Sequence, residues 1–86
     1  MLNKHDLELF KQIAMSFVSR GKWSWTRGEL RSRVAASGMC ADWERSLETL
    51  CRHGWMEALP RDVYRLNEQG KVEANKMIGP LAAGDM

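Results

Sequence analysis

The hydrophobic positions at the start of the chain repeat with the period of an α-helix. Asn3 and Asp6 are typical of a helix N-terminus, and apolar residues then recur three, four and seven positions apart over residues 7–18. The pattern predicts a helix that runs to about Ser19. Gly21 is the residue type that closes a helix at its C-terminus. One face of this helix is expected to lie in the core.

A short strand and a second helix are predicted next. The run Trp23-Ser24-Trp25 alternates large and small side chains, as a strand does. Thr26 and Glu29 then have the spacing of a capping box, in which each side chain accepts a hydrogen bond from a backbone amide at the helix start. The helix that begins there is expected to end at Ser37-Gly38, after about three turns.

The third predicted helix has the clearest amphipathic pattern. At 100° per residue its apolar side chains fall within an arc of about 100°. They are Cys40, Trp43, Leu47, Leu50 and Cys51. Gly54 ends this helix. The segments 55–59 and 63–66 have strand character and flank the turn residues Pro60-Arg61-Asp62, which predicts a β-hairpin.

The last predicted element is a helix over Glu68–Met77. Asn67 is a capping residue for it, and Gly70 weakens it by about 1 kcal/mol relative to alanine. Ile78-Gly79-Pro80 is expected to break the helix, so residues 78–86 are predicted to form a flexible C-terminal tail. The expected organisation is one domain over residues 1–77, of a mainly α class with a small β-hairpin.

Length and composition restrict the classes of function. A chain of 86 residues and 9.9 kDa has room for one domain with one modest core. It carries no glycine-rich phosphate loop and no nucleophile elbow, so we expect neither enzymatic activity nor a cofactor. No apolar run approaches the roughly 18 residues of a membrane span, and no signal peptide is evident, which favours a cytoplasmic protein. The histidines and cysteines lack zinc-site spacing, so no metal is expected, and Cys40 and Cys51 are interpreted as reduced core residues.

Positive charge gathers in one segment, although the formal net charge is only +2. Residues 22–38 contain four basic side chains and one acidic side chain, whereas residues 39–54 and residues 55–86 are both slightly acidic. The segment around residues 20–33 is therefore the part of the sequence that indicates an anionic partner.

The end of the third predicted helix and the second hairpin strand carry recognisable motifs. Residues 47–56 read L-x-x-L-x-x-x-G-W-M, and residues 63–70 read V-Y-x-L-N-x-x-G. Both resemble the winged helix-turn-helix family, whose return strand is commonly Y-x-L-T-x-x-G; Asn67 stands here in place of the usual threonine. The resemblance covers about residues 4–77. It implies a winged helix-turn-helix fold with a three-helix core, a short strand, a two-stranded wing and a C-terminal helix.

The resemblance implies double-stranded DNA as the partner, because the third helix of this family is available to the major groove and the wing lies beside it. Arg45, Thr49 and Arg52 on the exposed face of that helix are the candidate base readers. The candidate contacts to the DNA backbone are basic residues of the second helix, its approach and the wing, namely Arg20, Lys22, Arg27, Arg31 and Arg61. We therefore expect a small DNA-binding regulator of transcription or of a mobile element.

The same face also supports a protein-docking function. It carries Asp42, Glu44 and Glu48 beside its arginines, and carboxylates repel phosphates. Glu48 and Arg52 have the i, i+4 spacing of a solvated ion pair. The alternative function is a winged-helix interaction module, such as an adaptor or a phage-type (anti-CRISPR-like) inhibitor of a nucleic-acid-processing complex, with a protein of that complex as partner.

The tryptophans bear on this alternative. Trp43 and Trp55 are expected in the core. Trp23 and Trp25 are expected on the same side of the short strand, where they are either core residues or anchors of a protein interface. A homodimer is a further possible assembly, because doubling the DNA contacts raises affinity, and the first or the last helix would supply its interface.

Overall fold

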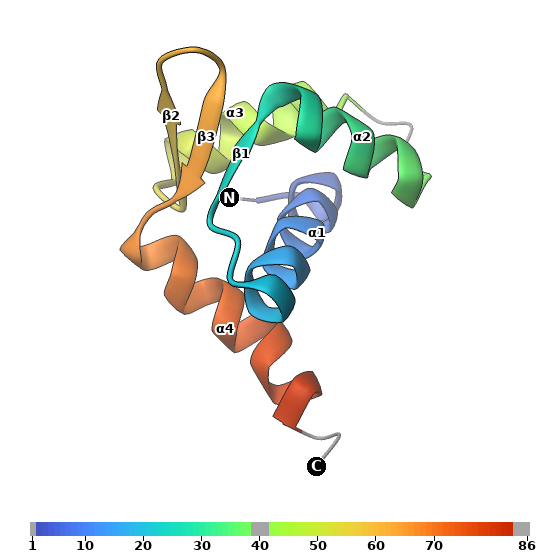
Figure 1. Ribbon diagram of the computed structural model, residues 1–86, viewed down its shortest axis with the longest axis vertical. Coiled ribbons are helices and arrows are strands. Elements are labelled where there is room, and N and C mark those ends of the chain that lie inside the picture. The colour runs from blue at the N-terminus through green and yellow to red at the C-terminus, as the bar shows by residue number, and fades with distance from the viewer. Residues whose placement is uncertain (1, 39–41, 84–86) are drawn as a thin grey trace.

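The computed structural model describes residues 2–38 and 42–83. Within them the elements are, in order, α1 (Lys4–Arg20), β1 (Ser24–Thr26), α2 (Arg27–Ser37), α3 (Trp43–His53), β2 (Met56–Leu59), β3 (Val63–Leu66) and α4 (Glu68–Ala83). In Figure 1, α2 and α3 cross the top of the view, α1 lies at the centre and α4 descends toward the C-terminus. The chain is mainly helical with a small antiparallel sheet, which confirms the broad fold class that the sequence predicted.

Both predicted helix caps at α1 and α2 are confirmed. Asn3 Oδ1 accepts from the Asp6 amide at 2.9 Å, and Asp6 Oδ2 accepts from the Asn3 amide at 3.0 Å. The Thr26 hydroxyl oxygen accepts from the Glu29 amide at 3.1 Å, and Glu29 Oε1 accepts from the Thr26 amide at 3.0 Å. Each box satisfies two backbone donors that a helix start leaves without partners. The cap also explains why the buried Asp6 carboxylate is tolerated.

The sheet has three antiparallel strands in the order β1-β3-β2. The predicted hairpin is confirmed, and β3 pairs on its other edge with β1, so that Tyr64 lies opposite both Ala58 and Trp25. The Arg27 amide donates to the Asp62 carbonyl at 2.8 Å, which ties the start of α2 to the hairpin turn. The hairpin therefore has a fixed position relative to α2.

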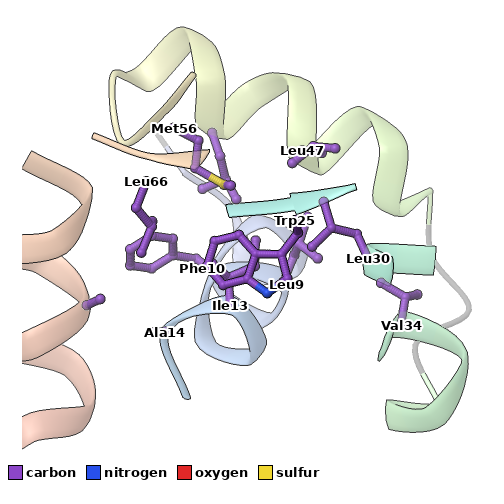
Figure 2. Close-up of a cluster of buried hydrophobic side chains, with 12 residues drawn as sticks. Leu9, Phe10, Ile13, Ala14, Trp25, Leu30, Val34, Leu47, Met56 and Leu66 are labelled. Carbon is purple, nitrogen blue, oxygen red and sulfur yellow. The ribbon is translucent and has the colours of Figure 1, made fainter. Parts of the chain in front are cut away.

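The core lies between α1, the sheet, α2 and α3 (Figure 2). Leu47 and Leu50 are 1% and 0% exposed, which confirms that the apolar face of α3 points inward. Trp43 and Trp55 are half-buried and pack against this core, and the Trp55 ring lies 4.6 Å from that of Phe10 between centroids. The polar face of α3 is consequently turned away from the core.

A close backbone contact joins α4 to the end of α3. The predicted Asn67 cap is confirmed, because Asn67 Oδ1 accepts from the Gly70 amide at 2.8 Å, and the Asn67 amide donates to the Trp55 carbonyl at 3.2 Å. A Cβ added at Gly70 would lie 1.9 Å from the Trp55 carbonyl oxygen. The sequence treats Gly70 only as a weak point in a helix, whereas the fold requires a residue without a side chain there.

Two predicted boundaries are wrong. The last helix continues through Gly79 and Pro80 to Ala83 instead of ending at Met77, and the flexibility of the C-terminal tail stays a prediction; residues 84–86 lie outside the described part. The residue before a proline usually leaves the helical region because its Cβ meets the proline ring, and a glycine has no Cβ. The third helix begins at Trp43 rather than at Cys40, because Asp42 has a non-helical backbone conformation; Cys40 is outside the described residues.

Candidate functional site

A groove of about 840 Å³ runs between the exposed face of α3 and the β2–β3 hairpin. All three predicted base readers line it. Its charged side chains are Arg27, Arg45 and Arg52 together with Asp42, Glu44 and Glu48. We call this surface the α3 groove. Positive and negative side chains are equal in number there, so the groove itself carries no net charge.

Arg27 connects three elements at the edge of the α3 groove. Its guanidinium is ion-paired with Glu44 of α3, and its Nη2 donates to the Tyr64 hydroxyl of β3 at 3.1 Å. These contacts raise the pKa of Arg27 above its ordinary value, and the hydrogen bond to Tyr64 is the main cause. The sequence predicts Arg27 as a phosphate contact. It does not predict the contact with Tyr64, because no local spacing relates residues that are 37 positions apart.

The predicted base readers differ in how available they are. Arg45 is exposed, and the structure gives it no ion pair with any described residue. The Thr49 hydroxyl donates to the Arg45 carbonyl at 3.0 Å, so only its acceptor capacity remains free. Arg52 is 2.6 Å from the Glu48 carboxylate, which confirms the predicted ion pair. Exposed pairs of this kind contribute only about 0–1 kcal/mol, so a phosphate competes readily for Arg52.

Two of the predicted backbone contacts lie beside this groove. Arg31 is exposed on α2 and shares a second depression with Arg27, Glu44 and Asp62. Arg61 is exposed in the hairpin turn next to Asp62, where both residues have positive φ, 66° and 57°. Such left-handed conformations are uncommon outside glycine, asparagine and aspartate.

The other two predicted backbone contacts lie elsewhere. Arg20 and Lys22 line a cleft of about 630 Å³ between α1 and α2, whose lining shares no residue with the α3 groove. The basic segment is divided because α2 presents its residues to two sides. Lys22 is ion-paired with Glu29. This pairing, and then the Thr26 amide, lower the pKa of Glu29.

The sequence shows Arg33 as one of the basic residues of the second helix but does not assign it to a site, and it gives no indication of Ser16 in this cleft. Arg33 Nη2 donates to the Ser16 hydroxyl oxygen at 2.9 Å, and Ser16 is buried. The i, i+4 spacing of Glu29 and Arg33 was the available signal, because it places both residues on the same side of α2. We call this surface the α1–α2 cleft.

The two tryptophans of the short strand have different environments. β1 begins at Ser24, and Trp23 lies directly before it, where its carbonyl accepts from the Leu66 amide at 2.9 Å. Trp25 is 3% exposed and belongs to the core, which removes it as an interface anchor. Trp23 is 46% exposed, and the Lys71 ammonium lies 4.7 Å from its ring centroid, a cation–π contact. Trp23 thus keeps an accessible aromatic surface.

An apolar groove separates the N-terminal part of α1 from α4. Leu7, Met77 and Ile78 line it with the side chains of Lys4 and Lys11. These are the two helices to which the sequence assigns any dimer interface, and the homodimer stays a prediction. In the described ranges no three or more histidine, cysteine, aspartate or glutamate residues come together as metal ligands would. None of the helices described there has the length and apolar character needed to cross a bilayer.

Comparisons with protein-family models, with curated proteins and with solved structures returned no match to this chain. The interpretation of its surfaces therefore rests on their geometry and charge. Three surfaces differ clearly in character: the charge-balanced α3 groove, the cationic α1–α2 cleft and the apolar groove between α1 and α4.

Proposed function

We propose that this chain is a winged-helix protein that binds double-stranded DNA, with α3 directed into the major groove and the β2–β3 hairpin acting as the wing. The observation that carries the proposal is the orientation of α3. Leu47 and Leu50 are buried on one side of the helix, while Arg45 is exposed on the other, beside the hairpin. The element order and the β1-β3-β2 sheet are those expected of a winged helix.

In this proposal the arginines have separate roles. Arg45 contacts a base edge, for which guanine is the preferred partner of an arginine. Arg31 and Arg61 flank the α3 groove and contact backbone phosphates. Arg27 positions α2, α3 and β3 relative to one another through Glu44 and Tyr64.

The charge of the α3 groove sets the expected affinity. Three carboxylates oppose the three arginines there, so few phosphates are neutralised per molecule. Affinity for random duplex is then micromolar or weaker at physiological salt and decreases as salt rises. A transcriptional or mobile-element regulator with such a surface depends on its specific base contacts for discrimination.

Anisotropy titration of a labelled random-sequence duplex at several salt concentrations tests the proposal. We expect Arg31→Ala to weaken binding and to reduce the salt slope by roughly one unit. Arg65→Ala is the matched control, because Arg65 pairs with Glu57 at 2.9 Å and alternates with Tyr64 onto the opposite face of the sheet. Absence of binding at low salt, or an equal effect of the control, would contradict the proposal.

The balanced charge of the α3 groove favours one second candidate, the docking of a protein component of a nucleic-acid machine. Complementary mixed charge gives specificity between proteins. The variant Glu48→Gln separates the two functions, because it frees Arg52 and removes a carboxylate that repels phosphates. Tighter DNA binding by this variant supports the first function, whereas unchanged DNA binding supports the second.

A further inference from the structure

Trp25, which lines the α1–α2 cleft, carries a buried hydrogen-bond donor that has no partner in the described part of the chain. Trp25 lines the cleft and is 3% exposed, yet its indole Nε1 has no acceptor among the described residues. Trp25 lies in the middle of the core cluster in Figure 2. Buried indole N–H groups usually find an acceptor, because leaving a buried donor unpaired is unfavourable. An indole N–H only donates, so any group that pairs with it supplies an acceptor atom.

The side chains around this donor are mainly cationic. Arg20, Lys22 and Arg33 line the cleft, and Glu29 is its one carboxylate among the described lining residues. Lys22 and Glu29 neutralise each other, which leaves the two guanidinium groups. Arg33 donates one hydrogen bond to Ser16, and its other guanidinium N–H groups are available to a ligand. The cleft is therefore positively charged, in contrast to the balanced α3 groove.

The α1–α2 cleft is separate from the surface to which we assign DNA. At 100° per residue, Arg31 and Arg33 lie roughly 160° apart around α2. Arg31 lines the depression beside the α3 groove, and Arg33 lines the cleft. A duplex on the α3 groove contacts one side of α2 and leaves the other side free. An anion that binds in the cleft is therefore expected to come from a small molecule in solution and not from the duplex.

We propose that the α1–α2 cleft binds a phosphate-type oxyanion carried by a small soluble molecule. The Trp25 N–H and the Arg20 and Arg33 guanidinium groups donate to its oxygens. Guanidinium forks match the oxygen spacing of phosphate. Because two guanidinium groups line the cleft, a phosphate dianion matches its charge better than a carboxylate monoanion does. This site goes beyond the proposed function and stands without it, because it shares no residue with the α3 groove.

The indole N–H signal of Trp25 in a ¹⁵N–¹H spectrum is the direct reporter. Inorganic phosphate is titrated into the full chain at constant ionic strength set with chloride. We expect the Trp25 signal to move to lower field with a saturable dependence, while the signals of the other three tryptophans stay in place. A linear drift without saturation, or a parallel drift of all four indole signals, would overturn the proposal.

Arginine variants assign the site. Arg20→Ala removes an exposed side chain, and Arg33→Gln removes a charge while keeping a donor for Ser16. Each should weaken phosphate binding by roughly fivefold or more, as loss of a charge-assisted contact does. Arg31→Ala is the control and should bind phosphate as the unmodified chain does. Equal affinity in all three variants would sink the assignment.

A short DNA duplex tests the source of the phosphate. The proposal expects the duplex to leave the Trp25 N–H signal unmoved, whether or not it binds the α3 groove. A Trp25 shift with duplex as large as that with inorganic phosphate would overturn the small-molecule source. Failure of the duplex to bind anywhere would contradict the proposed function alone.

Discussion

Replacing Gly70 with alanine reverses the expectation from helix propensity. In an exposed helix interior, glycine to alanine stabilises by about 1 kcal/mol. At Gly70 the new Cβ would lie 1.9 Å from the Trp55 carbonyl oxygen and 2.9 Å from its carbon. Ordinary contacts begin at 3.4 Å, so α4 has to move away from the end of α3 by more than 1 Å.

The movement of α4 relieves the overlap but also disrupts hydrogen bonds at the start of the helix. The Asn67 contacts to the Gly70 amide and the Trp55 carbonyl, 2.8 and 3.2 Å long, hold the start of α4 in place. Overpacking costs about 1–3 kcal/mol, and a lost cap costs about 1 kcal/mol. After the propensity gain is subtracted, we expect a loss of about 2 kcal/mol. For a domain of this size that corresponds to a melting temperature lower by about 8–16 °C.

Thermal and urea unfolding followed by circular dichroism measure this difference. Gly28→Ala is the matched control, since Gly28 lies in the first turn of α2 and its Cβ would meet only the Thr26 hydroxyl at 3.9 Å. We expect this control to be neutral or stabilising. Equal or higher stability of Gly70→Ala would refute the packing of α4 against Trp55.

Three further predictions follow from individual side chains. Lys22 and Thr26 lower the pKa of Glu29 in the folded chain. The ionised carboxylate therefore contributes fully to folding stability above its ordinary pKa of 4.5, and this contribution is lost as the pH falls through the lower pKa of the folded state. Glu29→Gln should therefore be less stable than the unmodified chain in urea at neutral pH and equal to it near pH 2. Burial, and to a lesser degree Glu48, raise the pKa of the half-buried Cys51 thiol. Alkylation of Cys51, measured by peptide mass spectrometry, should therefore be slow in the folded chain at pH 8 and fast in urea. Rapid alkylation of the folded chain would contradict this prediction. Leu50→Ala opens a cavity under α3 and should cost about 2–5 kcal/mol in the same unfolding assay, whereas a loss below 1 kcal/mol would place Leu50 outside the core.

Local sequence signals predicted most of the helices and strands. The two capping boxes mark the starts of α1 and α2 because their partners are only three residues apart. The period of Leu47 and Leu50 fixes the buried side of α3, and therefore the exposure of Arg45. These features depend on neighbours in the chain, which a sequence displays directly.

The features that the sequence did not predict depend on contacts between distant residues. Nothing local relates Arg27 to Tyr64 or Gly70 to Trp55. The first contact exists only once α2 and the hairpin are assembled, and the second only once α4 packs against the residue that follows α3. The division of the basic segment between two surfaces follows from the placement of α1 against α2. Charge counts along the chain therefore indicated an anionic partner without showing that two separate surfaces share the charge.

Amide chemical-shift mapping with a short DNA duplex tests the central claim most directly. The account predicts that the amides of residues 43–52, 61 and 62 shift on titration, while those of residues 68–76 in α4 stay in place. Shifts confined to α4 or to the α1–α2 cleft, or no shifts at low salt, would contradict it.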